Sequence, residues 1–399
     1  MGASGTQRLS TCRAPSPPPS PGGAGVCPLP LSVRRAIVIG GGPAGTVAAL
    51  LLARQGWGVT LVEQHRFPRD KVCGECLSAL GAEVLTRVGL FDELFRHQPV
   101  RLTRTSLHAP SGASVTTRLP RPMWGVSRVV LDGMLLDAAR REGVAVRQPA
   151  RAEAVEPGGV PMVRVRDLLT NQTELLSADR VIVADGKAAL LGDDGPPPPT
   201  GDLGIKSHFT GIDGPADCIE LFGTADCYGG LAPIEGGRWN AAFSVPAGRV
   251  RASHGNLDAV FAQLVPENVT LARRLAKATR TSPWLAAPLP RFAVRGRWPE
   301  NVIPVGNAAA AIEPIGGEGM GLAIRSAELA AAALTRSPQW GVDAADRLAL
   351  HYRQLWSTRG LACRAAARAV SSRRRANRFM PLVRAAPATL RPFLALMGK

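Results

Sequence analysis

Three glycines and one glutamate near the start of the chain have the spacing of a dinucleotide site. Gly40, Gly42 and Gly45 form the pattern G-x-G-x-x-G. In this pattern the first glycine makes a tight turn, the second lets a pyrophosphate approach the backbone, and the third lets a helix pack closely on a sheet. Glu63 follows 18 positions after Gly45, where a carboxylate accepts both hydroxyls of an adenosine ribose and disfavours a 2′-phosphate. The spacing therefore predicts binding of FAD or NAD.

The residues around this motif predict the elements that position it. Ala36 to Ile39 is an apolar run rich in β-branched residues, which is typical of a buried parallel strand. A helix is expected from Thr46 to about Gln55, ending at Gly56, and a second strand from Val59 to Val62. Strand, turn, helix, strand and acid thus follow one another as in a Rossmann-type unit. This order makes the motif more specific than its three glycines alone.

Three further segments complete a set of four motifs. Arg128 begins the sequence R-V-V-L-D at the start of an expected helix, and Asp185-Gly186 ends an apolar strand. Val305 to Leu334 passes from an apolar strand through a glycine-rich turn into an alanine-rich helix. Together the four motifs resemble the large FAD-binding fold shared by p-hydroxybenzoate-hydroxylase-type monooxygenases, flavin-dependent halogenases and geranylgeranyl-reductase-like flavoproteins. The resemblance implies FAD as the cofactor.

The resemblance also implies an architecture. It is an α/β protein with a Rossmann-like three-layer FAD-binding domain, an inserted antiparallel β-sheet substrate domain and a C-terminal helical tail. The Pro/Ser/Gly-rich start of the chain is expected to be disordered. The expected boundaries are 1–33 for the disordered segment, 34–100, 125–200 and 298–335 for the FAD-binding domain, 101–124 and 201–297 for the substrate domain, and 336–399 for the basic helical region.

Individual cofactor contacts follow from the resemblance. It implies that Arg128 touches the cofactor and that Asp185 lies near the pyrophosphate. The glycine-rich turn would hold the ribitol and lead under the flavin ring, because N–H groups at a helix N-terminus favour the negative charge of reduced flavin. At Asn307 the family normally has Asp; the amide keeps an acceptor for a ribitol hydroxyl but has no charge. The residues expected in the turn are Gly317, Gly319 and Met320.

Candidates for catalysis lie in two other segments. Phe67 to Ser78 resembles the Pro-x4-Cys-Gly loop of geranylgeranyl-reductase-like proteins, which borders the flavin. Cys73 in this loop is either a cofactor-facing thiol or a small buried side chain. Glu75 and Tyr228 are candidate proton donors, with a surface glutamate and a core tyrosine as the alternatives. His208, on an expected strand, is interpreted as structural.

The segment Tyr228 to Pro233 bears on the substrate. It reads Y-G-G-L-A-P, where the geranylgeranyl-reductase-like family has Tyr-x-Trp-x-Phe-Pro. Gly230 and Ala232 replace two large side chains, which predicts a wide cavity for a bulky hydrophobic secondary metabolite or lipid-like molecule. The expected reaction is C=C reduction or oxygenation through a flavin C4a-hydroperoxide. Electrons are expected from transiently bound NAD(P)H or from a separate reductant, because no second G-x-G-x-x-G follows a strand.

Two other functions stay open as alternatives. Flavin-dependent halogenases carry Trp-x-Trp-x-Ile-Pro, whereas no two tryptophans of this chain are two positions apart. Halogenation is therefore the weaker expectation. A non-catalytic scaffold that binds FAD or lipid-like ligands is the other alternative.

Composition and cysteine usage limit the class of protein further. The chain has 399 residues, of which 45% are hydrophobic, and no run of about 18 apolar residues suggests a spanning helix. Seven cysteines and the lack of an apolar signal-peptide region indicate reduced thiols and a cytoplasmic location. Cys73 and Cys76 form C-x-x-C, but no second pair follows at finger spacing. No metal site is therefore expected.

Charge is concentrated at the C-terminal end. The net charge is +17, and residues 347–399 contain twelve basic residues and no acid. This region is either a solvated helical face or a surface that contacts anionic membrane lipid or an acidic carrier protein. Nucleic acid is not an expected partner, because no recognised module or aromatic platform occurs.

Overall fold

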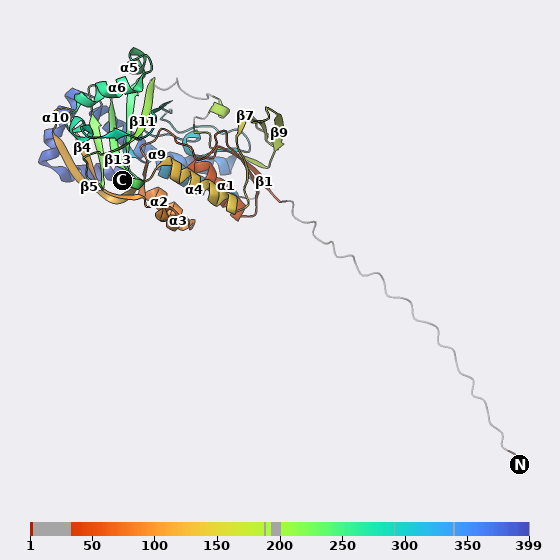
Figure 1. The fold of residues 1–399 in the computed structure, drawn as a ribbon. Helices are drawn as coiled ribbons and strands as arrows, with labels where there is room; N and C mark the ends of the chain where they lie inside the picture. Colours follow the sequence, from red (N-terminus) through yellow and green to blue (C-terminus); the bar gives the residue numbers. More distant parts are fainter. Residues whose placement is uncertain (3–32, 187–188, 193–200, 291, 338–339, 399) are drawn as a thin grey trace. The chain divides into compact units, whose positions relative to one another are not determined.

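The computed structural model describes residues 1–2, 33–186, 189–192, 201–290, 292–337 and 340–398 (Figure 1). The segment 1–33 predicted to be disordered lies almost entirely outside these residues. From Arg34 onward the chain builds two large sheets, a small third sheet and a set of covering helices.

A five-stranded parallel sheet positions the dinucleotide motif. Its strand order is β17-β10-β1-β2-β6. Apolar side chains cover both of its faces, because helices pack on one face and a small antiparallel sheet, β7-β8-β9, packs on the other. The parallel strands are β1 (Arg35–Ile39), β2 (Gly58–Val62), β6 (Ala145–Arg147), β10 (Arg180–Val183) and β17 (Val302–Pro304); the small sheet consists of β7 (Ala150–Glu156), β8 (Met162–Asp167) and β9 (Thr173–Ser177).

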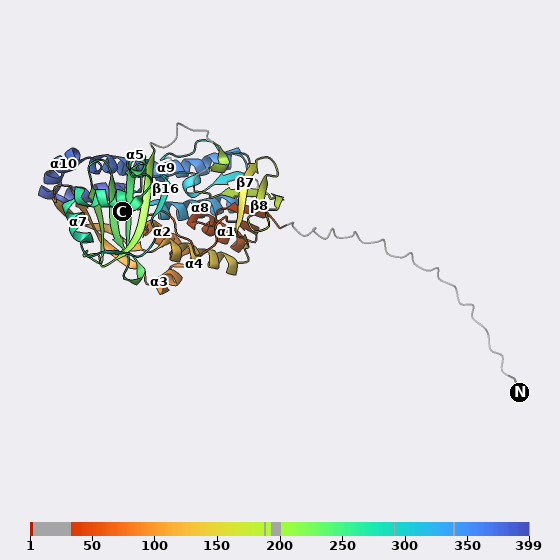
Figure 2. The same ribbon diagram turned by 45° about the horizontal axis from the view of Figure 1, so that its top comes forward.

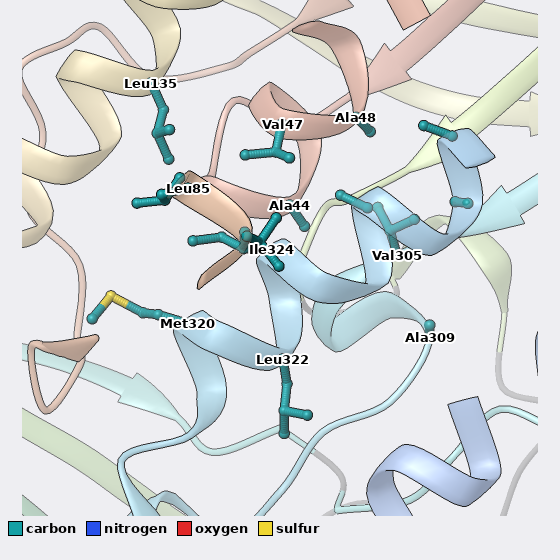
Figure 3. Packing of buried hydrophobic residues seen from close by; sticks show 14 of the residues in the cluster. Ala44, Val47, Ala48, Leu85, Leu135, Val305, Ala309, Met320, Leu322 and Ile324 are labelled. Carbon is teal, nitrogen blue, oxygen red and sulfur yellow. The ribbon is translucent and has the colours of Figure 1, made fainter. Parts of the chain in front are cut away.

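The face of the parallel sheet opposite the small antiparallel sheet is covered by five helices in the part of the chain that the structure describes. They are α1 (Pro43–Arg54), α2 (Ala79–Arg87), α3 (Phe91–Arg96), α4 (Arg128–Arg141) and α8 (Gly319–Arg336). Figure 3 shows Val47 of α1, Leu135 of α4 and Ile324 of α8 in one apolar cluster. Helix α1 begins three residues earlier than expected, because Pro43 is well suited to the first helical position. A Cβ atom on Gly45 would lie 1.9 Å from the carbonyl oxygen of Gly40, so close packing here requires glycine.

The second sheet has nine strands and carries the wall of a cavity. Its order is β15-β11-β14-β13-β12-β4-β5-β3, and β16 pairs with β11. All pairings are antiparallel except that of β12 with β4, which is parallel. The strands are β3 (Cys76–Leu77), β4 (Val100–His108), β5 (Ser114–Gly125), β11 (Asp202–Thr210), β12 (Cys218–Gly223), β13 (Tyr228–Pro233), β14 (Trp239–Pro246), β15 (Thr279–Arg280) and β16 (Leu285–Pro288).

Alternation along β13 decides which residues face the cavity. Strand β14 is followed in the sequence by the short helix α5 (Ala247–Ala252) and by α6 (Leu257–Leu264) and α7 (Val269–Leu275). Leu231 packs in an apolar cluster with residues of α6 and α7. Tyr228, Gly230 and Ala232 therefore share the opposite face.

The C-terminal region is helical. It consists of α9 (Val342–Val370), α10 (Arg373–Ala385) and α11 (Leu390–Leu396). Figure 2 shows α9 beside α8, to which it is tied because the Tyr352 hydroxyl donates to the carbonyl of Ser326 at 2.9 Å. A 3₁₀ turn at Pro387–Thr389 separates α10 from α11. No helix of the described residues is long and apolar enough to cross a bilayer.

Candidate cofactor site and active site

A cavity of about 260 Å³ lies where the two large sheets meet. The glycine-rich motif and the turn before α8 contribute one side, and strand β13 contributes the other. Among the predicted site residues, the cavity is lined by Gly42, Cys73, Glu75, Arg128, Tyr228, Asn307, Gly317, Gly319 and Met320. The structure thus brings together five segments that are far apart in the sequence.

Three cations lie beside two glycines of the cavity wall, Gly42 and Gly186. A Cβ atom on Gly42 would lie 3.7 Å from Nη2 of Arg69 and 3.8 Å from Nη2 of Arg128. A Cβ atom on Gly186 would lie 2.9 Å from Nζ of Lys71. The lack of side chains on these glycines leaves space beside the three cations, which fits an anionic group such as the pyrophosphate of FAD.

The charges at this place are not balanced by the protein itself. Burial, followed by the charges of Arg128 and Arg69, lowers the pKa of Lys71 to about 8. The Nε of Arg69 is buried and has no hydrogen-bond partner among the described residues. Asp132 accepts two bonds from Arg128, at 2.7 and 2.6 Å, and Glu63 lies 3.7 Å from Arg69. Asp132 also lies 3.2 Å from Arg69. Two carboxylates face three cations, so the protein leaves an excess of positive charge that an anionic ligand can neutralise.

Glu63 lies at the end of β2 beside the glycine-rich turn. Its carboxylate accepts the N–H of Gly41 and the N–H of His65, each at 2.7 Å. These bonds fix its position, and each oxygen retains a lone pair for a ribose hydroxyl. Asp185 accepts the N–H of Leu190 at 3.3 Å and does not line the cavity, whereas its neighbour Gly186 does.

The glycine-rich turn before α8 opens onto the same cavity. Gly317 has φ +69°, the left-handed region that favours glycine. A Cβ atom on Gly319 would meet nothing within 4 Å, so the first turn of α8 is open to a ligand there. Asn307 is exposed and Met320 is buried, and both line the cavity. The arrangement fits a planar ring at the N-terminus of α8.

Glu75 lies in a buried charge network. Its carboxylate accepts from Nζ of Lys206 at 2.6 Å, from Nε2 of His208 at 2.7 Å, and from the N–H of Arg128 at 2.7 Å. Lys206 also donates to Asp70 at 2.5 Å. Asp70, Glu75 and His208 could together ligate a metal, but the ammonium of Lys206 already lies against both carboxylates. The network holds the loop of Cys73 and Glu75 onto strand β11.

Sequence reasoning missed Lys206 and Asp70 in this network. Gly204, Lys206 and His208 alternate along β11, so they share one face of the sheet. A lysine and a histidine on the same face of a buried strand indicate a nearby carboxylate, because buried charges are normally paired.

Cys73 is partly exposed at the cavity wall. Its carbonyl accepts from Nδ2 of Asn240 at 3.0 Å, and its sulfur accepts the N–H of Glu75 at 3.4 Å. Cys73 and Cys76 are both in the reduced, thiol form, and both line the cavity.

Tyr228 lies on the cavity wall with a carboxylic partner. Its hydroxyl donates to Oε1 of Glu313 at 2.5 Å. Burial, together with the negative charge of Glu313, raises the pKa of Tyr228 well above its ordinary value. Burial also raises the pKa of Glu313. The pair can therefore store a proton next to the cavity. No spacing in the sequence marks Glu313, which lies just before the glycine-rich turn.

Comparison with protein families agrees with this geometry. The family described as an FAD binding domain matches residues 34–344, which is most of the chain. The predicted FAD cofactor is confirmed by this match.

Curated proteins that resemble the chain include a receptor, a reductase and a monooxygenase. The Conditioned medium factor receptor 1 of Dictyostelium discoideum is 25% identical over 77% of this chain, and the chain spans 64% of that protein's length. A menaquinone reductase of Mycolicibacterium smegmatis is 27% identical over 75% of this chain and 76% of its own length. An FAD-dependent monooxygenase of Beauveria bassiana is 31% identical over 43% of this chain and 42% of its own length.

Solved structures show the same fold. A myxobacterial chondrochloren halogenase has a TM-score of 0.73 at 22% identity, over 85% of this chain and 83% of its own. A geranylgeranyl bacteriochlorophyll reductase-like protein of Thermoplasma acidophilum has a TM-score of 0.72 at 17% identity, over 85% and 88%. The predicted α/β fold is thereby confirmed. At these identities the likeness concerns the fold alone.

Proposed function

We propose that this chain, which belongs to the FAD binding domain family, is a reductase among the FAD-dependent oxidoreductases. In this proposal it reduces a carbon–carbon double bond in a bulky hydrophobic substrate. The observation that carries the proposal is the hydrogen bond between Tyr228, which is buried at the cavity wall, and the partly buried Glu313. Reduction of a double bond requires a proton donor in addition to the reducing cofactor, and this pair supplies one.

The chain's own residues hold the cofactor in this proposal. Arg69, Lys71 and Arg128 bind the pyrophosphate, and Glu63 binds the ribose. The open first turn of α8 would hold the flavin ring, whose reduced form would supply a hydride, that is two electrons and one proton, to the substrate.

Protonation of Glu313 prepares Tyr228 for proton transfer. When Glu313 is ionised, the hydroxyl of Tyr228 donates to it and its proton is directed away from the cavity. When Glu313 is protonated, its carboxyl group donates to the Tyr228 oxygen, and the phenolic proton is free to reach a substrate. Tyr228 then gives the second proton to the substrate carbon, and Glu313 replaces it.

The substrate class is argued from the cavity wall. Gly230 and Ala232 line the cavity where larger side chains would fill it. A Cβ atom on Gly230 would lie 3.0 Å from the carbonyl oxygen of Glu220, so a tryptophan there would require a shift of the backbone. Similarity to menaquinone reductases over three quarters of the chain supports a quinone-bearing lipid as the substrate.

A second candidate function is oxygenation of a hydrophobic substrate. It is favoured by the similarity to an FAD-dependent monooxygenase, which covers less of the chain. Halogenation has less support, because no tryptophan of the described residues lines the cavity. Binding of FAD without turnover is the non-catalytic alternative.

The test follows the mass of the product. The FAD-loaded protein is reduced anaerobically with NADPH, or with dithionite if NADPH fails, and menaquinone is added as the probe. We expect a product that gains two hydrogens and keeps them after exposure to air, which returns any quinol to the quinone. A gain of one oxygen in air would instead support the monooxygenase.

The substitution Tyr228→Phe tests the proton donor. We expect product formation to slow by about 10²–10⁴-fold, because the phenolic proton is lost. Bleaching of the flavin by the reductant should keep its normal rate. If product formation by the variant matches the unchanged protein, Tyr228 is a core residue and not the donor.

A further inference from the structure

The solvent-exposed face of helix α10 carries both basic and apolar side chains. Arg374, Arg375 and Arg378 are exposed, and so are Phe379 and Leu382, the latter to 71%. At about 100° per residue these five side chains lie within an arc of about 140°. The other side of the helix is buried against β5 and the main body, through Ala376, Met380 and Val383. Figure 1 shows α10 at the edge of the second sheet, beside β4 and β5.

The charge around this face selects an anionic partner. None of the three arginines has a carboxylate partner among the described residues. Residues 347–399 contain no aspartate or glutamate that could provide one locally. Nearby on α11, Arg391 and Leu396 repeat the combination of an exposed arginine and an exposed leucine.

We propose that the α10 face, defined as Arg374, Arg375, Arg378, Phe379 and Leu382, docks on an anionic lipid bilayer. Leu382 lies between Arg378 and Arg375 around the helix, so the apolar and basic side chains alternate rather than separate. Such a face suits a bilayer, where apolar side chains enter below the headgroups and guanidinium groups stay at the phosphates. An acidic protein surface would match the arginines but would leave the two apolar side chains without apolar partners.

This proposal does not rest on the proposed reaction, because none of the five residues lines the cavity. If both hold, the enzyme can take a lipid-like substrate from the membrane on which it docks.

Co-sedimentation with vesicles tests the proposal on the full FAD-loaded chain. The probes are vesicles of phosphatidylcholine alone and vesicles of phosphatidylcholine and phosphatidylglycerol in equal parts. We expect binding to the mixed vesicles, weakened by salt, and little binding to the neutral ones. Each arginine near an anionic surface contributes about fivefold to partitioning, so R374Q/R375Q/R378Q should lose on the order of 100-fold.

Matched variants separate this face from general charge and hydrophobicity. The control R66Q/R96Q/R251Q removes three exposed arginines on other elements and should bind as the unchanged protein does. F379S/L382S should weaken binding at least tenfold, whereas V160S/L175S, at exposed positions near the small sheet, should not. All variants should keep the flavin spectrum.

Two results would overturn the proposal. One is equal sedimentation with neutral and mixed vesicles. The other is retention on immobilised polyglutamate without binding to mixed vesicles, which would assign the face to an acidic protein.

Discussion

At the scale of single residues, the site is shaped by buried charges that the fold leaves incompletely balanced. Lys71 is the clearest case, because it lies among Arg69 and Arg128 and its pKa falls to about 8. A bound pyrophosphate would favour the charged lysine and raise this pKa again. Binding of FAD and protonation of Lys71 are therefore linked.

The linkage predicts how FAD affinity depends on pH. Below pH 8 Lys71 is protonated with or without FAD, so it adds no pH dependence. Above pH 8 binding must take up a proton, and the association constant should fall by up to about tenfold per pH unit. Quenching of FAD fluorescence on titration with apoprotein measures this constant. Lys71→Met should bind FAD more weakly at pH 7 and lose the decline, whereas the exposed-site control Lys277→Met should retain it. If the association constant of Lys71→Met still falls above pH 8, the pH dependence belongs to another titratable group.

At the scale of elements, the loop after β2 is held to strand β11 by charge. Lys206 and Glu75 are fully buried, and Glu75 has φ +55°, a backbone conformation that is strained for a glutamate. Such a conformation persists only where the surroundings hold it. The bonds from Lys206 and His208 do so, and they place Cys73 and Glu75 at the cavity wall.

Removal of the lysine should therefore release the loop. Lys206→Met leaves two carboxylates without their cation, and breaking such a buried pair typically costs about 3–5 kcal/mol of unfolding free energy. Urea denaturation followed by circular dichroism measures the loss. Lys277→Met removes an exposed lysine and should change stability little. Equal stability of the two variants would show that the network does not hold the loop.

The sequence predicted the parts of the site that depend on neighbours along the chain. Gly40, Gly42, Gly45 and Glu63 belong to one continuous unit, so their spacing specifies their arrangement. Pairs such as Lys206 with Glu75 and Tyr228 with Glu313 join residues 131 and 85 positions apart. Nothing local marks such partners, since they meet only when the two sheets are assembled.

At the scale of the whole molecule, the C-terminal region is part of the core on one side and a free surface on the other. Tyr352, Trp356 and Cys363 of α9 are buried in the same cluster as the FAD-binding helices. The basic character of the region suggested a separate tail, but its apolar stripe packs on α8 and the glycine-rich turn. The predicted alternatives of a solvated face and a docking surface therefore apply only to its outer side.

The two sides of α9 should respond differently to truncation of side chains. Trp356→Ala leaves a cavity in the core and should cost about 3–5 kcal/mol of unfolding free energy. Leu350→Ala, at a side chain that is 51% exposed on the same helix, should change it by less than about 0.5 kcal/mol. Thermal denaturation of both variants compares them directly. Similar losses would mean that α9 is not anchored through its inner side.

The strand order of the parallel sheet has a consequence for synthesis on the ribosome. Strand β1 carries the dinucleotide motif but pairs with β10, which follows about 144 residues later, and β10 in turn pairs with β17. While the first half of the chain emerges, β1 therefore has an open edge on the β10 side. Helix α8, which forms the end of the flavin site, is translated later still. The complete cofactor site can therefore form only after α8 has been synthesised, late in translation.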